Sequence, residues 1–336
     1  MTGLREWLRA MPKAELHVHL EGTMAPDLYQ RIAKRNGLPA GDDAGYAFSD
    51  FPSFLRAFLT AVKVLQKPED FADLTRAYLQ KSAADGVKHV EFMLSPATQR
   101  TFAPKIDVSE MVVAVSDEIE RAKLETGISA VMIFDIVRNL GVEAGLRDVE
   151  LARRNKDRGV VGVGLGGDER SFPARDFQEV FIAAANAGLR RTAHAGEASG
   201  PESVVDAVRL LGAERIGHGV AAAARPDVLR LLADDDVAID ACPTSNAVTG
   251  AVKSGESHPL KVFMEAGVTV SLSSDDPAFF GVSLLDEYMY AAQRLGLERS
   301  ELATLAANGF HASFAPDEKK VAWEDELKRY LSGSTG

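Results

Sequence analysis

Eight short apolar runs recur along the chain, and each is followed by Gly, Asp, Ser or Pro and then by a helical pattern. The runs are continuous rather than alternating, which is typical of strands buried on both faces of a parallel sheet. They begin at Ala14, His89, Ile128, Val160, Arg191, Arg215, Ala238 and Thr269. Eight repeats of strand and helix predict an α/β fold, the TIM or (β/α)₈ barrel.

The chain is longer than a plain barrel requires. A (β/α)₈ barrel needs roughly 250 residues, and this chain has 336, with most of the excess between the first two strands. We therefore expect one domain, residues 1–336, with helices inserted over roughly 23–85. Such an insertion lies over the C-terminal mouth of the barrel and acts either as a lid or as a packed flange. Its aromatic residues at 3–4 spacing line a cleft or form a helix packing face: Phe48, Phe51, Phe54 and Phe58.

Composition excludes several classes of partner and site. The formal net charge of -11 repels phosphate backbones and anionic membranes. The chain has no apolar stretch of 18 residues, and its charged N-terminus lacks a signal-peptide core. The single cysteine, Cys242, excludes an intrachain disulfide and a cysteine-built zinc site. We expect a cytoplasmic protein with no nucleic-acid or membrane partner, and no oligomeric state follows from the sequence.

Polar residues stand where the strands of this barrel end. His17 and His19 are two apart in the first strand, so both point into the barrel. Two buried imidazoles are costly unless both are hydrogen-bonded or bind a metal. Later strands add more polar residues at the same ends: His194, His218, Asp275 and Asp276. The ends of parallel strands meet at one mouth, so we expect these side chains to converge.

Three histidines and one aspartate form a nitrogen and oxygen ligand set that suits zinc. A catalytic zinc keeps one position open for water and lowers the pKa of that water from about 15.7 toward about 7. The other histidines, His89, His258 and His311, are not accompanied in the sequence by further candidate metal ligands. His258, in ESHPL, is expected in a loop or at a helix start.

Six motifs follow this pattern along the chain. They are PKAELHVHLEG (12–22), GLGGDE (164–169), HAGE (194–197), RIGHGV (215–220), CPTSNAVTGAV (242–252) and SSDDPAFFG (273–281). In this order and spacing they make the chain similar to the adenosine deaminase family of the amidohydrolase superfamily, over nearly its full length. The resemblance implies a hydrolase that acts on the C–N bonds of cyclic amidines.

The resemblance also implies roles for individual residues. One Zn²⁺ per subunit would be ligated by His17, His19, His194 and Asp275. A protonated Glu197 would face N1 of a 6-aminopurine, and His218 would orient the attacking water and take its proton. Asp276 would face N7, and the backbone of Gly167 would face N3. His19 and Glu21 would contact the substrate as well.

The chemistry agrees with these roles. Replacing the amino group at C6 requires a nucleophile, a proton donor and a place for the developing charge. A carboxyl group in a dry cleft keeps its proton because desolvation raises its pKa, so Glu197 suits the donor role.

The substrate depends on Glu21. Adenosine-specific relatives usually carry Asp at this position, where it holds the ribose 5′ end. HLEG and SDDPAFFG are similar to the adenine deaminase branch, whereas GLGGDE and CPTSNAVTGAVK are similar to the nucleoside branch. We expect deamination of adenosine or 2′-deoxyadenosine to inosine or 2′-deoxyinosine first. The alternatives are a 5′-modified nucleoside such as aminodeoxyfutalosine, and free or N6-substituted adenine.

Two other functions are compatible with such a barrel. A metal-dependent amide or ester hydrolase of this scaffold commonly uses two metals and a lysine at the end of strand 4, but GLGGDE contains no lysine. A barrel retained as a binding protein would normally have lost a ligand or Glu197, and the chain keeps both.

Overall fold

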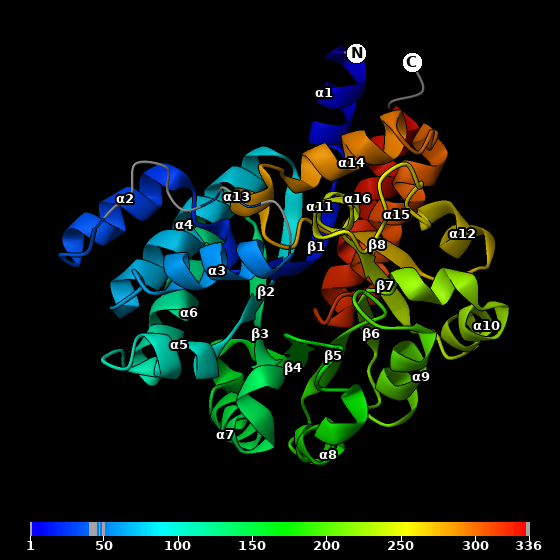
Figure 1. Cartoon of the computed structure of the whole chain (residues 1–336). Helices are drawn as coiled ribbons and strands as arrows, with labels where there is room; N and C mark the ends of the chain where they lie inside the picture. Colours follow the sequence, from blue (N-terminus) through cyan, green and yellow to red (C-terminus); the bar gives the residue numbers. More distant parts are fainter. Residues whose placement is uncertain (1, 40–45, 47, 49–50, 334–336) are drawn as a thin grey trace.

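Eight parallel strands form the centre of the computed structural model, which describes residues 2–39, 46, 48 and 51–333. Neighbours in sequence are neighbours in the sheet, from β1 to β8 (Figure 1). The strands are β1 (Lys13–His19), β2 (Val87–Leu94), β3 (Ser129–Val137), β4 (Val160–Gly166), β5 (Arg190–Ala195), β6 (Arg215–His218), β7 (Ala238–Ala241) and β8 (Val270–Leu272). A bridge between Val18 and Asp275 brings β1 to the segment after β8, so the barrel is nearly closed.

Each predicted apolar run is a strand, and the predicted TIM barrel is confirmed. The strands are buried almost along their whole length, as expected for a sheet with a packed interior and a cover of helices. One boundary differs from the prediction. Strand β8 ends at Leu272, so Asp275 and Asp276 lie in the loop after it rather than at its last residues. We keep as a prediction that residues 1–336 form one domain.

Helices surround the strands (Figure 1). Their bounds are α1 (Thr2–Ala10), α2 (Pro26–Arg35), α3 (Phe51–Val62), α4 (Pro68–Ala84), α5 (Pro96–Phe102), α6 (Val108–Thr126), α7 (Gly141–Arg154), α8 (Gln178–Asn186), α9 (Pro201–Arg209), α10 (Pro226–Asp234), α11 (Pro243–Thr249), α12 (Leu260–Glu265), α13 (Pro277–Phe280), α14 (Leu284–Gln293), α15 (Arg299–Ala312) and α16 (Asp317–Gly333). Short 3₁₀ turns lie between them, including Glu21–Thr23 after β1. Helix α8 shows why these segments fold: Val180, Phe181 and Ala184 share one buried face.

The insertion after β1 is narrower than the predicted span of 23–85. Helix α4 contacts α6 and β2, as a helix of the barrel's own ring does. Its apolar residues Phe71, Leu74 and Leu79 are fully buried. The extra helices are therefore α2 and α3. Helix α3 contacts α5 and α11, which follow β2 and β7, so α3 lies over the C-terminal mouth.

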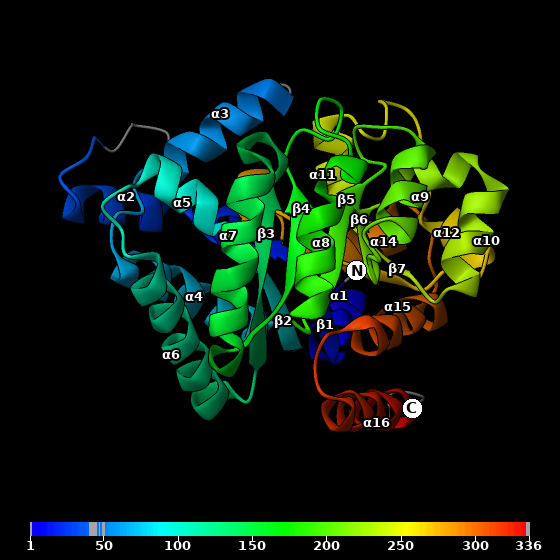
Figure 2. The same cartoon turned by 90° about the horizontal axis from the view of Figure 1, so that it is seen from below.

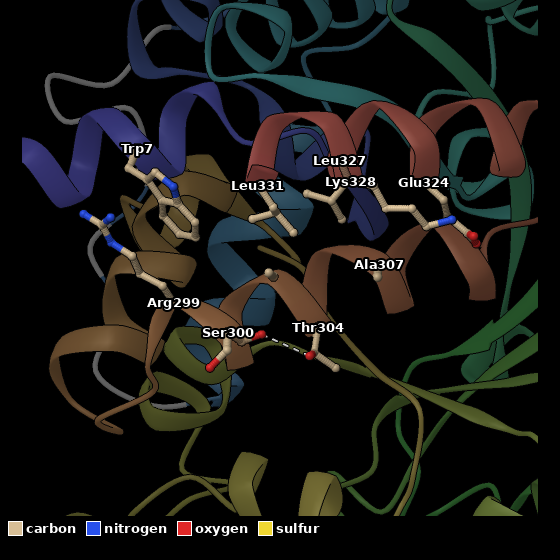
Figure 3. Close-up of a pocket in the computed structure, with 10 residues that line it drawn as sticks. Trp7, Arg299, Ser300, Thr304, Ala307, Glu324, Leu327, Lys328 and Leu331 are labelled. Atoms are coloured by element: carbon tan, nitrogen blue, oxygen red, sulfur yellow. Dashed lines mark hydrogen bonds between the residues drawn. The ribbon is translucent and has the colours of Figure 1, made fainter. Parts of the chain in front are cut away.

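The two ends of the chain pack together. Tyr330 of α16 donates a hydrogen bond to the carbonyl of Trp7 in α1 at 2.7 Å, and α16 also contacts α15 (Figure 2). A cavity of about 550 Å³ lies between these three helices, where Trp7, Arg299 and Leu331 face one another (Figure 3). This cavity holds no cluster of metal-ligating side chains among its lining residues. Within the described ranges, no helix has the length and apolarity that a membrane span requires.

Candidate active site

Four side chains from β1, β5 and the loop after β8 meet at the mouth of the barrel. One ligand atom from each of His17, His19, His194 and Asp275 lies within 4.8 Å of all the others. The Nε2 atoms of His19 and His194 are 3.3 Å apart. Asp275 Oδ1 lies 3.4 Å from His17 Nε2 and 3.3 Å from His19 Nε2. Ligands about 2.0–2.1 Å from a tetrahedral zinc ion are separated by about 3.3 Å, so this spacing fits one such ion.

The protonation of two of these histidines, His17 and His194, also fits a metal. His194 Nδ1 lies 3.1 Å from the carbonyl oxygen of Leu165. That oxygen can only accept, so Nδ1 carries the proton and Nε2 presents its lone pair to the centre. Burial lowers the pKa of both His17 and His194, which keeps their rings neutral, the form that binds metal.

His17 and Asp275 add a further sign of a bound ion. His17 is 1% exposed, and neither ring nitrogen has a hydrogen-bond partner within the described ranges. An unsatisfied buried polar group is costly, and a metal bond would remove that cost. Ser245 Oγ donates to Asp275 Oδ2 at 2.7 Å, which leaves Oδ1 turned toward the histidines. The four residues therefore suit one metal ion.

Glu197 and His218 lie beside this cluster, as the resemblance implies. Glu197 follows β5 and His218 ends β6, and their Oε2 and Nε2 atoms are 3.7 Å apart. Burial raises the pKa of Glu197, and the charges of Asp275 and Glu169 add to that effect. His218 and the hydroxyl of Thr249 act in the opposite direction, but the net shift is upward. The carboxyl group next to the cluster therefore keeps its proton to a higher pH than an ordinary glutamate does.

Asp276 and Gly167 face the same cavity of about 130 Å³. Asp276 is 4% exposed, and its Oδ1 has no hydrogen-bond partner in the part of the chain that the structure describes. Burial, together with the charge of Asp275, raises the pKa of Asp276 well above its ordinary value. A Cβ on Gly22 would lie 2.0 Å from Asp276 Oδ1, so the glycine of HLEG leaves room for this carboxyl. Gly167 follows β4 with a φ of +91°.

The inserted helix α3 forms one wall of the cavity. Phe54 and Phe58 line it together with other residues of α3. Phe54 also stacks on Phe280, and Phe48 packs against Phe54 with ring centroids 5.3 Å apart. The side chain of Phe51 lies outside the described residues. Phe54 and Phe58 therefore serve both predicted purposes, since they line the cavity and also pack against Phe280 and Phe279.

Glu21 does not line the cavity. Its carboxylate accepts hydrogen bonds from the Ser95 N–H at 3.3 Å and from Gln99 Nε2 at 3.1 Å, and the residue is 2% exposed. Ser95, by contrast, is a lining residue. The Glu21 carboxylate is therefore engaged inside the protein, one residue away from the space that a substrate would fill.

Glu169, the last residue of GLGGDE, was given no role from the sequence, but it contacts the turn that carries Glu197. Its carboxylate accepts from the backbone N–H groups of Gly196, Glu197, Ala198 and Ser199, at 2.6, 3.2, 2.7 and 3.0 Å. Glu169 therefore fixes the turn that carries Glu197. The signal was present in the sequence as an acid directly after a glycine-rich strand end, but its partners are about 30 residues away.

The variant Glu169→Gln is expected to lower kcat by roughly 10–100-fold with little change in KM, because an amide turns one N–H₂ group toward backbone donors. Steady-state kinetics on the best substrate would measure this. Glu179→Gln, on the exposed surface of α8, makes the same chemical change away from the site and should leave kcat unchanged. A wild-type kcat in Glu169→Gln would show that the turn keeps its geometry without the carboxylate.

His258 is connected to the site by hydrogen bonds, although no other candidate site residue lies beside it in the sequence. It lies in the loop before α12, as expected, but it is 4% exposed and its Nε2 is 3.1 Å from Asn246 Oδ1. Asn246 Nδ2 is in turn 3.0 Å from His218 Nδ1. The backbone N–H of Leu260 donates to His258 Nδ1, so His258 carries its proton on Nε2 and donates to Asn246.

This chain of hydrogen bonds orients His218. Asn246 donates to His218 Nδ1, so a neutral His218 carries its proton on Nε2, the atom nearest Glu197. In that form His218 offers a hydrogen-bond donor to an attacking water. The implied role of taking a proton from that water requires the opposite tautomer.

Relatives of known name match the whole chain. A family model described as adenosine deaminase matches residues 12–330. The adenine deaminase of Cupriavidus metallidurans is 37% identical over 339 residues, which cover 99% of this chain and 95% of that protein. The aminodeoxyfutalosine deaminase of Streptomyces avermitilis is also 37% identical and covers 98% of this chain and 94% of that protein. Neither of these two relatives is named for adenosine.

Solved structures agree with the fold and the family. The adenine deaminase of Arthrobacter aurescens superposes with a TM-score of 0.91 at 34% identity and covers 96% of this chain and 100% of that chain. An amidohydrolase from Burkholderia ambifaria with bound Zn has a TM-score of 0.92 at 25% identity and covers 99% of this chain and 95% of that chain. The chain therefore belongs to the adenosine deaminase family, whose members are hydrolases that act on the C–N bonds of cyclic amidines.

Proposed function

We propose that this protein is a zinc-dependent hydrolase that removes the 6-amino group of free adenine, releasing ammonia and hypoxanthine. The observation that carries the proposal is the buried Glu197, whose pKa is raised by burial, in one cavity with His19, His194 and Asp275 of the metal cluster. The zinc-bound structural relative and the tetrahedral spacing support the choice of metal.

Free adenine is preferred to adenosine for two reasons. The relatives compared above are named for adenine and for aminodeoxyfutalosine, so the expectation of adenosine as first substrate gains no support from them. In addition, Glu21 stands where adenosine-specific relatives hold the 5′ end, and its carboxylate is engaged by Ser95 and Gln99. A 5′-modified nucleoside such as aminodeoxyfutalosine is the second candidate because a relative of equal identity carries that name.

Several polar residues of the cavity have separate roles in the proposed reaction. A bound zinc ion supplies an activated water and a Lewis acid. Glu197 donates its proton to N1, which makes C6 more electrophilic. His218 orients the attacking water through its Nε2–H. Burial and the charge of Asp275 raise the pKa of Asp276, and in its protonated form Asp276 would donate to N7, while the Gly167 backbone faces N3.

The surroundings of the site suit a small purine. Phe54 and Phe58 of α3 cover the cavity and exclude water, which strengthens each hydrogen bond inside. The net charge of -11 is in keeping with a cytoplasmic enzyme that has no nucleic-acid or membrane partner.

Ammonia release from a panel of 6-aminopurines tests the proposal. The zinc-loaded protein would be assayed with adenine, adenosine, 2′-deoxyadenosine, N6-methyladenine and aminodeoxyfutalosine. We expect the highest kcat/KM on adenine, and the highest value on aminodeoxyfutalosine would select the second candidate. A protein that holds one zinc per chain and releases no ammonia from any of these compounds would not be a deaminase of this class.

A further inference from the structure

Asp135, in strand β3, lines the cavity and has no part in the reaction described above. The residue is 4% exposed, and its Oδ1 has no hydrogen-bond partner among residues 2–39, 46, 48 and 51–333. The nearby Arg138 does not satisfy it, because its guanidinium donates to the carbonyls of Phe172 and His194. A buried carboxylate oxygen without a donor is costly, and a donor from a ligand would remove that cost at Oδ1.

Strand β4 is shaped around this carboxylate. Asp135 is paired with Gly164 across the β3–β4 ladder. A Cβ on Gly166 would lie 2.5 Å from Asp135 Oδ2, and a Cβ on Gly164 would lie 3.1 Å from Asp135 Oδ1. Any larger residue at either position would have to displace the carboxylate. The glycines of GLGG therefore leave the space in which Asp135 reaches the cavity.

The order of the strands places Asp135 relative to the purine. In the proposed orientation, N1 faces Glu197 after β5, N3 faces Gly167 after β4, and N7 faces Asp276 after β8. Around the purine edge opposite C6, the nitrogen atoms follow in the order N1, N3, N9 and N7. N9 must therefore lie between the ends of β4 and β8, on the arc formed by β3, β2 and β1.

Few groups on that arc can accept a hydrogen bond from N9. The cavity-lining residues there with polar side chains are His19, Ser95, Thr98 and Asp135. His19 belongs to the metal cluster, and the other two carry neutral hydroxyl groups. Asp135 supplies the carboxylate, and a charged acceptor makes the stronger hydrogen bond.

We propose that Asp135 accepts a hydrogen bond from the N9–H of free adenine and so makes the site selective for the free base. This inference rests on the proposed function and extends it. Free adenine carries a proton on N9, whereas a nucleoside carries its sugar there and has no such donor. A nucleoside in the same orientation would leave the carboxylate without that partner.

The test compares adenine with 9-methyladenine, which lacks only the N9–H donor. The zinc-loaded wild-type protein is expected to prefer adenine in kcat/KM by roughly 10–100-fold, the range for a hydrogen bond to a charged group. Asp135→Leu, which has the same branching but a larger volume and no acceptor, should lower kcat/KM for adenine until the two substrates are nearly equal. Asp135→Asn keeps a neutral acceptor and should retain a preference of roughly 2–10-fold.

Two comparisons separate this role from a structural one. A steric exclusion of the methyl group would survive unchanged in Asp135→Asn, because asparagine has the same size. Asp148→Asn removes another buried carboxylate, which is paired with Arg100 outside the cavity, and should leave the adenine preference as in wild type. If Asp135→Leu fails to fold, the ratio measured with Asp135→Asn decides the matter.

Several results would overturn the inference. Equal losses for adenine and 9-methyladenine in both Asp135 variants would show that the residue only supports the fold. The inference would also be overturned if the wild-type protein had the same kcat/KM for adenine and for 9-methyladenine. If the variants instead lose discrimination between adenosine and 2′,3′-dideoxyadenosine, the carboxylate serves sugar hydroxyls. Failure of the proposed function is a separate result, since the wild-type protein would then release ammonia from no member of the panel.

Discussion

Glu197→Gln is expected to lower kcat on adenine by about 10²–10⁴-fold, the range for loss of a general acid. The variant keeps the size of the side chain but has no acidic proton to give to N1. Burial holds the pKa of the wild-type carboxyl above its ordinary value, so the acid form persists toward neutral pH. Steady-state ammonia release, with a melting curve to confirm folding, would measure the effect.

The pH dependence gives a second readout of the same group. Because the protonated form of Glu197 is the active one, kcat of the wild-type protein should fall as pH rises through its raised pKa. That fall should be absent from the residual activity of Glu197→Gln. Glu202→Gln, on the nearby helix α9 with its side chain 69% exposed, should behave as wild type in both respects. Near-normal activity in Glu197→Gln would remove Glu197 from the role of proton donor.

Removal of the metal is expected to lower kcat by about 10³-fold or more, because an activated water is worth several kcal/mol of barrier. Treatment with a chelator, followed by metal analysis and an ammonia assay, would measure the loss, and added Zn²⁺ should restore activity. The melting temperature should fall as well, since a ligand that binds only the folded state stabilises it by about 2.7 kcal/mol at about 100 times its Kd.

Asp275→Asn provides the matched variant for this experiment. It removes the charge of one ligand while keeping its size, so it should hold less zinc at a given free concentration. The chelated wild-type protein and this variant should therefore share low activity and a low melting temperature. Full activity in a preparation with far less than one metal ion per chain would contradict the metal-dependent mechanism.

Local patterns in the sequence were sufficient to predict the barrel. Continuous apolar runs can be recognised without knowledge of their neighbours, and eight of them separated by helices leave few alternatives. The same is true of the cluster of His17, His19, His194 and Asp275. Each residue lies in the last part of a strand or in the loop that follows it, and parallel strands bring these ends to one mouth, so the fold itself predicts that these residues meet.

Hydrogen-bond partners across loops were not predictable in this way. The carboxylate of Glu21 turns to Ser95 and Gln99, which follow β2, and Glu169 reaches the turn after β5. His258 reaches His218 through Asn246. Each choice depends on how segments that are 12 to 78 residues apart pack against each other, and no local pattern records it.

The sequence by itself predicted the number of strands from residue type and spacing, and its resemblance to the adenosine deaminase family implied the ligand set and the acid at Glu197. The tertiary structure alone decided that Glu21 is engaged inside the protein and that Asp135 faces the cavity without a partner. The physical reason is that an isolated carboxylate has the same chemistry in any sequence. Its role depends on which donors the folded chain brings within hydrogen-bond distance and which it leaves for a ligand.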